Sequence, residues 1–277
     1  MRRNSLLLAA FFLLFAWPAR AAELPDHPLI EKAKQMRAPR VQYAQENGAH
    51  VELTSDGKSF YLYWFPEGAD PAKAPIIVTM HGHGSFAFED FQVWHKFLKE
   101  RGYGFLAIQW WIGEGEETSD YLKPEEMYRT FDQVLKKWNV TPGRALLHGF
   151  SRGSANIYPV AALDRQTGNN YFSLFIANAG RANSNYPPVH AIENGTFGEK
   201  PFEGTRWVTY AGGKDTNPDR DGFPAMRATG EWLKKYGATI ELAIEDPNFG
   251  HGGFHMNPKN TESALDEFDK ILKENKS

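Results

Sequence analysis

Apolar and polar residues alternate along the chain in two kinds of segment. Short uninterrupted apolar runs, such as APIIVTM at residues 74–80, predict strands buried on both faces of a sheet. Longer segments with apolar residues three and four apart, such as residues 88–101, predict amphipathic helices. We predict strands at residues 51–54, 59–65, 74–80, 104–110, 145–148, 173–177, 207–211 and 239–244. We predict helices at residues 88–101, 123–138, 154–163, 223–236 and 261–272.

The order of these elements indicates the fold class. The first two strands surround the turn Ser55-Asp56-Gly57, which predicts an antiparallel start, and the later strands alternate with helices. Such alternation predicts an α/β fold with a mostly parallel sheet and helices on both faces. Because the chain has no internal repeat and no low-complexity linker, we expect one domain at residues 51–277, preceded by an N-terminal arm at residues 22–50.

Residues 1–21 have the pattern of a secretory signal peptide. Two arginines precede an apolar run at residues 5–17, Pro18 ends it, and Ala19-Arg20-Ala21 supplies small residues for cleavage. A membrane anchor is the alternative, but the run is shorter than the ~20 residues that a spanning helix needs. We therefore predict cleavage after residue 21 or 22, a periplasmic or secreted protein, and no stable membrane anchor.

Composition excludes several classes of protein. The sequence has 31 basic and 34 acidic residues and a formal net charge of −3, so it lacks the basic excess typical of nucleic-acid binding. It has no cysteine, which excludes disulfides, thiol catalysis and cysteine-ligated zinc or iron–sulfur clusters. We predict no cofactor. With 42% hydrophobic residues, the chain has enough apolar material for one sizeable core.

The strongest chemical motif is Gly149-Phe150-Ser151-Arg152-Gly153. This G-x-S-x-G pattern follows a predicted strand and precedes a predicted helix, which is the context that a nucleophile elbow requires. The glycines permit a sharp turn that leaves the Ser151 hydroxyl exposed. An ordinary serine in a glycine-rich turn is the alternative. We predict Ser151 as a nucleophile.

A serine nucleophile needs a neighbouring base, and the base needs an orienting acid. On this architecture the acid and then the histidine follow the serine, at the carboxyl ends of strands. Asp215 follows the predicted strand at 207–211, and His251 follows the strand at 239–244. We predict Asp215 as the orienting acid and His251 as the base, with His255 as the substitute base.

The loop after residues 74–80 reads His81-Gly82-His83-Gly84-Ser85. One oxyanion donor on this architecture is the amide after the nucleophile, here Arg152, and the other comes from this loop. We predict the His83 amide as the second donor, with Gly82 as the alternative. Two donors would stabilise the transition state by several kcal/mol, at about 3–4 kcal/mol for one. The His81 side chain is expected to shape the loop.

Aromatic residues near the strand ends are candidates for the substrate pocket. Trp110 and Trp111 lie at the end of a predicted strand, and we predict that they form a wall for an acyl or aryl group. Weaker candidates are Tyr186, Phe202 and Phe254. The span at residues 180–204 is too short for a large lid. We therefore predict a small or absent lid over an open cleft, which suits a bulky or polymeric ester.

Over about residues 50–275, the sequence resembles the α/β-hydrolase superfamily. The resemblance rests on the order and the predicted elements of four features: His81-Gly82, the elbow, Asp215 and His251. The resemblance implies the α/β-hydrolase fold, with about eight strands, and a Ser-His-Asp hydrolase that forms an acyl-enzyme. Within the superfamily, Asp215-Thr216-Asn217-Pro218 and Gly250-His251-Gly252 are similar to motifs of secreted polyhydroxybutyrate depolymerases and feruloyl esterases. This second resemblance implies a carboxylic-ester hydrolase that acts on a small-molecule or polymeric ester.

Three alternatives to an esterase stay open. A serine peptidase of the same fold would use the same three side chains. A metal-dependent hydrolase would use His81, His83, His251 and His255 as ligands, but the HGHGS segment has no further acidic ligand nearby, and we predict no metal. A non-catalytic binding protein could have the same scaffold, because a fold does not determine a function.

The acid loop also resembles the start of a calcium-binding loop. It has acidic or amide side chains at Asn217, Asp219 and Asp221, followed by Gly222. Ala228 stands where such a loop needs its final bidentate acid. We therefore expect a solvated acidic turn here.

Overall fold

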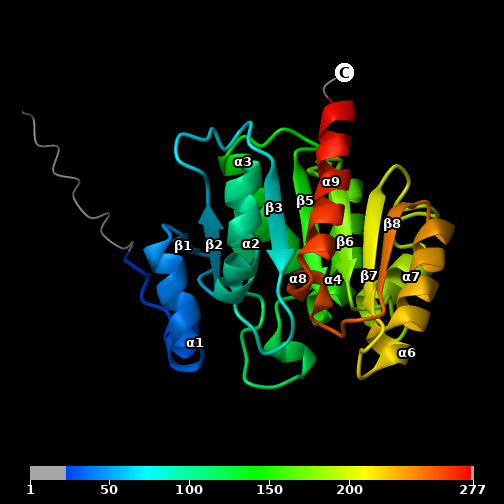
Figure 1. Cartoon of the computed structure of the whole chain (residues 1–277), viewed down its shortest axis with the longest axis horizontal. Coiled ribbons are helices and arrows are strands. Elements are labelled where there is room, and N and C mark those ends of the chain that lie inside the picture. Colours follow the sequence, from blue (N-terminus) through cyan, green and yellow to red (C-terminus); the bar gives the residue numbers. More distant parts are fainter. Residues whose placement is uncertain (1–22, 276–277) are drawn as a thin grey trace, which may run out of the picture.

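Eight strands form one sheet in residues 23–275, the part of the chain that the computed structural model describes (Figure 1). The strands are β1 (His50–Leu53), β2 (Phe60–Trp64), β3 (Ile76–Met80), β4 (Gly104–Ile108), β5 (Ala145–Phe150), β6 (Phe172–Asn178), β7 (Arg206–Gly212) and β8 (Thr239–Asp246). Their spatial order is β1-β2-β4-β3-β5-β6-β7-β8, and only the pairs made by β2 are antiparallel. The predicted mostly parallel sheet with an antiparallel start is confirmed.

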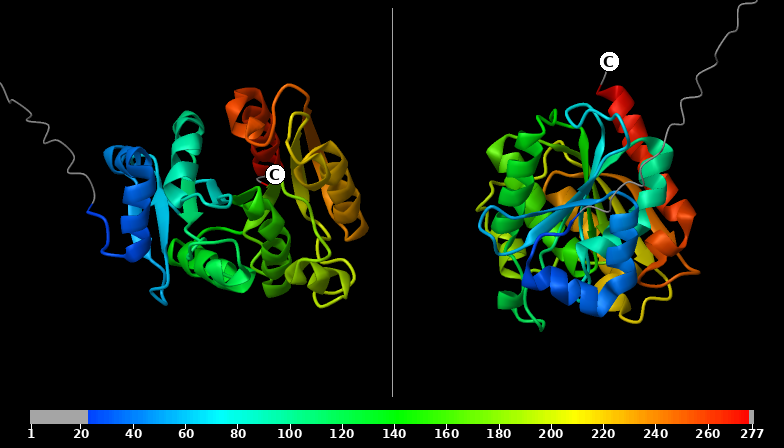
Figure 2. Two further views of the ribbon diagram at one scale, coloured as in Figure 1. Left: turned by 90° about the horizontal axis from the view of Figure 1, so that it is seen from below. Right: turned by 90° about the vertical axis from the view of Figure 1, so that its left-hand side faces the viewer.

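Helices cover both faces of this sheet. They are α1 (Pro28–Glu46), α2 (Ala87–Arg101), α3 (Pro124–Lys137), α4 (Arg152–Thr167), α5 (Pro187–Glu193), α6 (Pro218–Asp221), α7 (Phe223–Lys235), α8 (Gly253–Met256) and α9 (Pro258–Glu274). Figure 2 shows α2 and α9 on one side of the sheet and α3 and α4 on the other, while α7 packs against β7 and β8. The five predicted helices are confirmed; α5, α6 and α8, each of seven residues or fewer, were not predicted.

The predicted N-terminal arm contains α1, which is packed onto the rest of the molecule through α2. The Tyr43 hydroxyl lies 2.9 Å from His95 Nδ1, and Arg37 pairs with Glu89 at 3.0 Å. The helix is kinked at Arg37, two residues before Pro39, whose ring cannot fit a regular helix interior. The predicted signal peptide lies outside the described residues, and none of the helices in residues 23–275 is both long and apolar enough to cross a bilayer.

The register of the parallel strands aligns their carboxyl ends at one edge of the sheet. Met80 of β3 pairs with Gly149 of β5, and Asn178 of β6 pairs with Tyr210 of β7. Every residue of β3 and β4 is buried, in agreement with their continuous apolar sequences. Segments that follow β3, β5, β7 and β8 therefore meet at this edge, although they lie far apart in the sequence.

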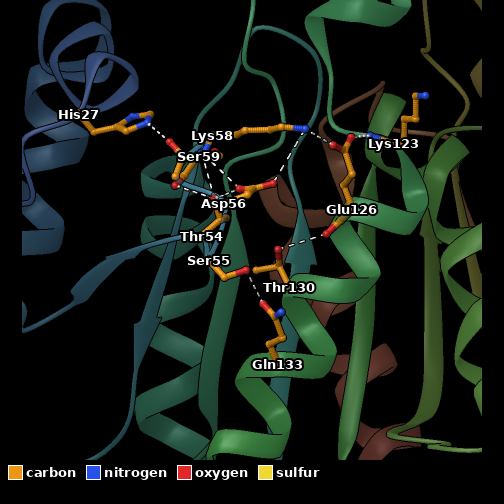
Figure 3. Close-up of polar contacts among 11 residues, drawn as sticks. His27, Thr54, Ser55, Asp56, Lys58, Ser59, Lys123, Glu126, Thr130 and Gln133 are labelled. Atoms are coloured by element: carbon orange, nitrogen blue, oxygen red, sulfur yellow. Dashed lines mark hydrogen bonds and ion pairs between the residues drawn. The ribbon is translucent and has the colours of Figure 1, made fainter.

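A polar network attaches the turn between β1 and β2 to the start of α3 (Figure 3). Lys58 Nζ lies 2.6 Å from Glu126 Oε1, and Ser55 Oγ donates to Gln133 at 2.9 Å. The same Glu126 accepts a hydrogen bond from the Lys123 amide at 2.9 Å, which caps the helix. Because Lys123 lines the cleft described below, this network positions part of the cleft wall.

Candidate active site

The turn between β5 and α4 holds Ser151 in a strained backbone conformation. Its φ of 54° and ψ of −116° lie outside the regions that residues with a side chain normally adopt. The Ser151 amide donates to the Asn178 carbonyl at 2.8 Å, which helps to maintain this conformation. Such a strand–turn–helix geometry presents a serine hydroxyl at the head of a helix, as the motif predicted.

Three glycines make this turn sterically feasible. A Cβ added to Gly153 would lie 2.2 Å from the Met80 carbonyl oxygen, and one added to Gly149 would lie 2.5 Å from the Gly153 oxygen. A Cβ added to Gly180 would lie 2.1 Å from the Ser151 carbonyl oxygen. All three contacts are with backbone, which cannot rotate away. The pattern revealed the first two glycines, whereas the role of Gly180 depends on where β6 ends.

Replacing Gly153 with alanine is expected to lower the free energy of unfolding by about 3 kcal/mol or more, because the added methyl group overlaps the β3 backbone. Gly230 in α7 is the matched control, since a Cβ added there has no atom within 4 Å. Gly230→Ala should instead raise the free energy of unfolding by about 0.5–1 kcal/mol. Urea titrations measure both, and equal effects would contradict this explanation of the motif.

The histidine and the acid predicted from the strand ends form a direct pair. His251 Nδ1 lies 2.8 Å from Asp215 Oδ2, and the Asp215 side chain is only 2% exposed. Because Nδ1 donates to the carboxylate, Nε2 is left free to accept a proton. The remaining Asp215 oxygen accepts the Asn217 amide at 2.9 Å. Asp215 is therefore a buried, oriented carboxylate and not a solvated turn acid.

The loops that carry this pair are packed closely against each other. The Lys214 amide donates to the Phe249 carbonyl at 2.9 Å, and the Tyr210 hydroxyl donates to the Gly250 carbonyl at 3.0 Å. A Cβ added to Gly212 would lie 2.3 Å from the Gly250 oxygen. This contact between the loops after β7 and β8 fixes the distance between acid and histidine.

A second carboxylate, Asp221, lies near the same imidazole. Its Oδ2 is 3.9 Å from His251 Nδ1 and 2.6 Å from Arg220 Nε, and its side chain is 5% exposed. Burial raises the pKa of Asp221, while the Arg220 guanidinium opposes that shift. The expectation of a solvated acidic turn is therefore wrong for Asp221, because the one-turn helix α6 directs it inward.

Within residues 23–275, side chains with metal-ligand geometry are found in this cluster. Among the described residues, Asp215, Asp221 and His251 are the group whose ligand atoms lie within 4.8 Å of one another. The histidines of the metal alternative do not converge. His81 Nδ1 bonds the Gly82 carbonyl, and the His255 ring packs 4.9 Å from the Trp94 ring. In this cluster the Asp215 carboxylate already pairs with His251, and the Asp221 carboxylate already pairs with Arg220.

Ser151 and His251 both line a cleft of about 920 Å³ at the carboxyl edge of the sheet. Their side chains do not form a direct hydrogen bond, and such bonds often tighten only when substrate is bound. The cleft walls come from two segments, residues 116–125 and 180–191. The second contains α5, the one helix between β6 and β7, so a small cap is present where a small or absent lid was predicted.

The predicted oxyanion donors share the cleft with Ser151. His83 and Arg152 both line the cleft, and neither amide donates a hydrogen bond to another described residue. The Gly82 amide is equally unpaired, and a Cβ added there would lie 3.5 Å from the Ser151 Cβ. Arg152 also begins α4, where helix amides point toward bound anions. His83 and Gly82 therefore both remain candidates for the second donor.

His81 shapes the loop, as expected. Its Nδ1 bonds the Gly82 carbonyl at 2.8 Å, and the Trp110 indole donates to the His81 carbonyl at 2.9 Å. Burial lowers the pKa of His81 to about 4, so its imidazole is neutral at physiological pH. Of the two predicted wall residues, Trp110 lines the cleft. Trp111 lies outside the lining, covered by the Lys32 ammonium 3.7 Å from its ring centroid.

The weaker pocket candidates separate in the same way. Tyr186 lines the cleft, and its hydroxyl donates to Asn156 at 2.6 Å. Phe202 and Phe254 are fully buried, so these two predictions are wrong. Phe202 packs with Trp207, 5.6 Å away, in the core. Large aromatic side chains are more often used to fill a core than to line a cleft.

The substitute base, His255, is partly buried and directs its ring into the protein interior. Both of its ring nitrogens are buried without a hydrogen-bond partner, and its ring contacts those of Trp94, His148 and Phe254. Burial lowers the pKa of His255 to about 3. His255 does not line the cleft that contains Ser151, so it is not placed to act as the base.

His255→Phe is expected to preserve catalysis and to stabilise the protein by about 1–3 kcal/mol, because it removes two unpaired buried nitrogens. The stabilisation should grow as pH falls from about 6.5 toward 3, since the unfolded state binds a proton in this window and the folded state does not. Urea unfolding of both proteins at about pH 8 and about pH 5 measures this. A constant difference at the two pH values would contradict the buried neutral histidine.

Sequence reasoning missed the cleft wall after β4. There the Arg152 guanidinium lies 4.7 Å above the Tyr121 ring and pairs with Glu116 at 3.1 Å. The Tyr121 hydroxyl also hydrogen-bonds His83. No sequence signal showed that the loop after β4 returns over the elbow.

No protein-family model matches the sequence, and neither does any curated protein. Solved structures similar to it include an esterase of Rhizomucor miehei, with 13% identity, 90% of this chain and 92% of that chain covered, and a TM-score of 0.63. A hyperthermophilic esterase of Pyrobaculum calidifontis has 16% identity, 88% and 92% coverage, and a TM-score of 0.60. Esterase B of Lactobacillus rhamnosis has 13% identity, 89% and 94% coverage, and a TM-score of 0.62. These similarities show a shared α/β-hydrolase fold.

Proposed function

We propose that this protein of the α/β-hydrolase fold is a carboxylic-ester hydrolase that acts through a Ser-His-Asp triad. The observation that carries the proposal is the Asp215–His251 pair, whose histidine lines the same cleft as a serine on a strained strand–turn–helix turn. An activated serine needs both an adjacent base and a group that orients the base. The esterases with a similar fold support ester cleavage as the reaction.

The proposed reaction begins when His251 Nε2 removes the proton from the Ser151 hydroxyl. The Ser151 oxygen attacks the ester carbonyl carbon, and the negative charge on the carbonyl oxygen is stabilised by the amides of Arg152 and of His83 or Gly82. The imidazolium then protonates the departing alcohol, which leaves an acyl-enzyme on Ser151. Water, deprotonated by His251, hydrolyses the acyl-enzyme and restores the serine.

Burial of Asp215 supports its proposed role. A carboxylate with a 2% exposed side chain is poorly screened by water, so it stabilises the imidazolium that forms beside it. Its hydrogen bond to Nδ1 also keeps the proton off Nε2 in the resting enzyme. Asp221 adds negative charge nearby, but its 2.6 Å contact with Arg220 balances that charge.

Two finer proposals come from the sequence. Residues 1–21 support export to the periplasm or the medium, which N-terminal sequencing of the mature protein would test. The resemblance to polyhydroxybutyrate depolymerases and feruloyl esterases supports a polymeric or aryl ester substrate. A cleft of about 920 Å³ with Trp110 in its lining is large enough for an aryl group.

A panel of substrates tests the proposed function. Purified protein is given p-nitrophenyl acyl esters, methyl ferulate, polyhydroxybutyrate and peptide p-nitroanilides. We expect hydrolysis of esters at a kcat/KM at least about a hundredfold above that of the anilides. Preferential cleavage of the anilides would indicate the peptidase alternative, and chelator-sensitive activity that survives Ser151→Ala would indicate the metal alternative.

A further inference from the structure

A cationic side chain next to the Ser151 turn has no carboxylate partner among the described residues. Arg181 lines the cleft together with Ser151 and His251. It directly follows Gly180, whose backbone approaches Ser151 so closely that an added Cβ would lie 2.1 Å from the Ser151 carbonyl oxygen. The Arg181 backbone is therefore held next to the nucleophile turn by a contact that leaves little freedom.

The Arg181 guanidinium is incompletely satisfied. Its Nη1 donates to the Asp219 carbonyl at 2.9 Å, and its Nε is buried with no hydrogen-bond partner. A guanidinium has five N–H donors, and within residues 23–275 no carboxylate lies within 4.0 Å of this one. Nη2 forms no hydrogen bond with the described residues and, unlike Nε, is not buried, so it can bind a ligand in the cleft.

The other charges in the cleft leave that positive charge uncompensated. Arg152 pairs with Glu116 at 3.1 Å, and Arg220 pairs with Asp221 at 2.6 Å. The two further charged residues of the lining, Lys123 and Glu125, are opposite in sign. Arg181 therefore differs from Arg152 and Arg220 in that no carboxylate of the described residues competes with a negative substrate group for its guanidinium.

We propose that Arg181 binds a carboxylate of the substrate, so that the preferred substrate is an ester that also bears a carboxylate on its acyl or its alcohol part. A guanidinium donates charge-assisted hydrogen bonds to a carboxylate, and these are stronger than its hydrogen bonds to an uncharged ester group. This inference rests on the proposed function. It adds a substrate class: half-esters of dicarboxylic acids, esters of hydroxy acids, and aryl esters with a ring carboxylate.

The test compares esters that match in size and differ in charge. Mono-p-nitrophenyl glutarate is paired with p-nitrophenyl valerate for the acyl side, and 4-acetoxybenzoate is paired with phenyl acetate for the alcohol side. In at least one pair, the anionic-to-neutral ratio of kcat/KM should fall about tenfold or more in Arg181→Gln. The KM of wild-type protein for that anionic ester should rise with salt, and that for its neutral partner should not.

Arg227→Gln is the matched control. Arg227 is an exposed arginine, with a side chain 65% exposed, that pairs with Glu245 outside the cleft lining, so its loss should leave both ratios unchanged. An unchanged ratio in Arg181→Gln for both pairs would overturn the inference. If that variant fails to fold, a salt-independent KM of wild-type protein for both anionic esters would overturn it instead.

Failure of the proposed function can be distinguished from failure of this inference. If the protein hydrolyses none of the four esters, the proposed function is wrong, and titration calorimetry with glutarate then tests the carboxylate site alone. Binding of glutarate by wild-type protein and not by Arg181→Gln would support the site. Equal binding, or none by wild-type protein, would overturn it.

Discussion

Ser151→Ala is expected to lower kcat for a p-nitrophenyl ester by about 10⁴-fold or more, because no other hydroxyl occupies the strained turn at the head of α4. His251→Ala should cause a loss of similar size. The double variant should be no worse than either single one, since the two side chains act as a unit. Stopped-flow and steady-state assays of the three variants measure this.

Folding must be preserved for these losses to be informative. Alanine at residue 151 or 251 adds no atoms to the core, so urea unfolding midpoints should stay close to that of wild-type protein. His255→Phe supplies a second control, because it changes a neighbouring histidine that lies outside the cleft lining. Additive losses in the double variant would mean that Ser151 and His251 do not cooperate.

Asp215→Asn is expected to lower kcat by about 10³–10⁴-fold with the fold intact. An asparagine amide donates to His251 Nδ1, which moves the imidazole proton to Nε2 and removes the base that faces Ser151. Asp221→Asn should lower kcat by about tenfold at most, because Asp221 lies 3.9 Å from Nδ1 and is engaged by Arg220.

The comparison of these two isosteric variants assigns the orienting acid. Both carboxylates are buried and both lie on the segment after β7, so loss of negative charge near His251 is common to both substitutions. They differ in the hydrogen bond to Nδ1, which only Asp215 forms. A larger loss in Asp221→Asn than in Asp215→Asn would exchange their assigned roles.

The regular elements, and the places of the proposed nucleophile, acid and histidine at the strand ends, could be predicted from the sequence because each depends on local chemistry. Buried parallel strands need continuous apolar runs, and the carboxyl ends of such strands converge. That rule was enough to predict that Asp215 and His251 lie close together, although they are 36 positions apart in the sequence. The elbow glycines were recognisable because the turn leaves no room for a side chain at these positions: a Cβ added to Gly153 would lie 2.2 Å from a backbone oxygen.

Side chains on irregular loops could not be placed in this way. Asp221 was expected in water because Asn217, Asp219 and Asp221 alternate with other residues in a polar stretch, yet one turn of helix directs Asp221 to His251. Arg181 lines the cleft because it lies three residues after Asn178, where β6 ends. Trp110 and Trp111 were predicted together, but successive residues of an extended chain point to opposite sides, so only Trp110 lines the cleft.

Covalent labelling with a fluorophosphonate tests most directly whether Ser151 is activated. The reagent forms a stable adduct only with a serine whose hydroxyl is deprotonated by a neighbouring base during attack. Mass spectrometry of wild-type protein should find a stoichiometric adduct on the peptide that contains Ser151, and His251→Ala should remain unlabelled. An unlabelled Ser151 in protein that still hydrolyses esters would contradict the proposed triad.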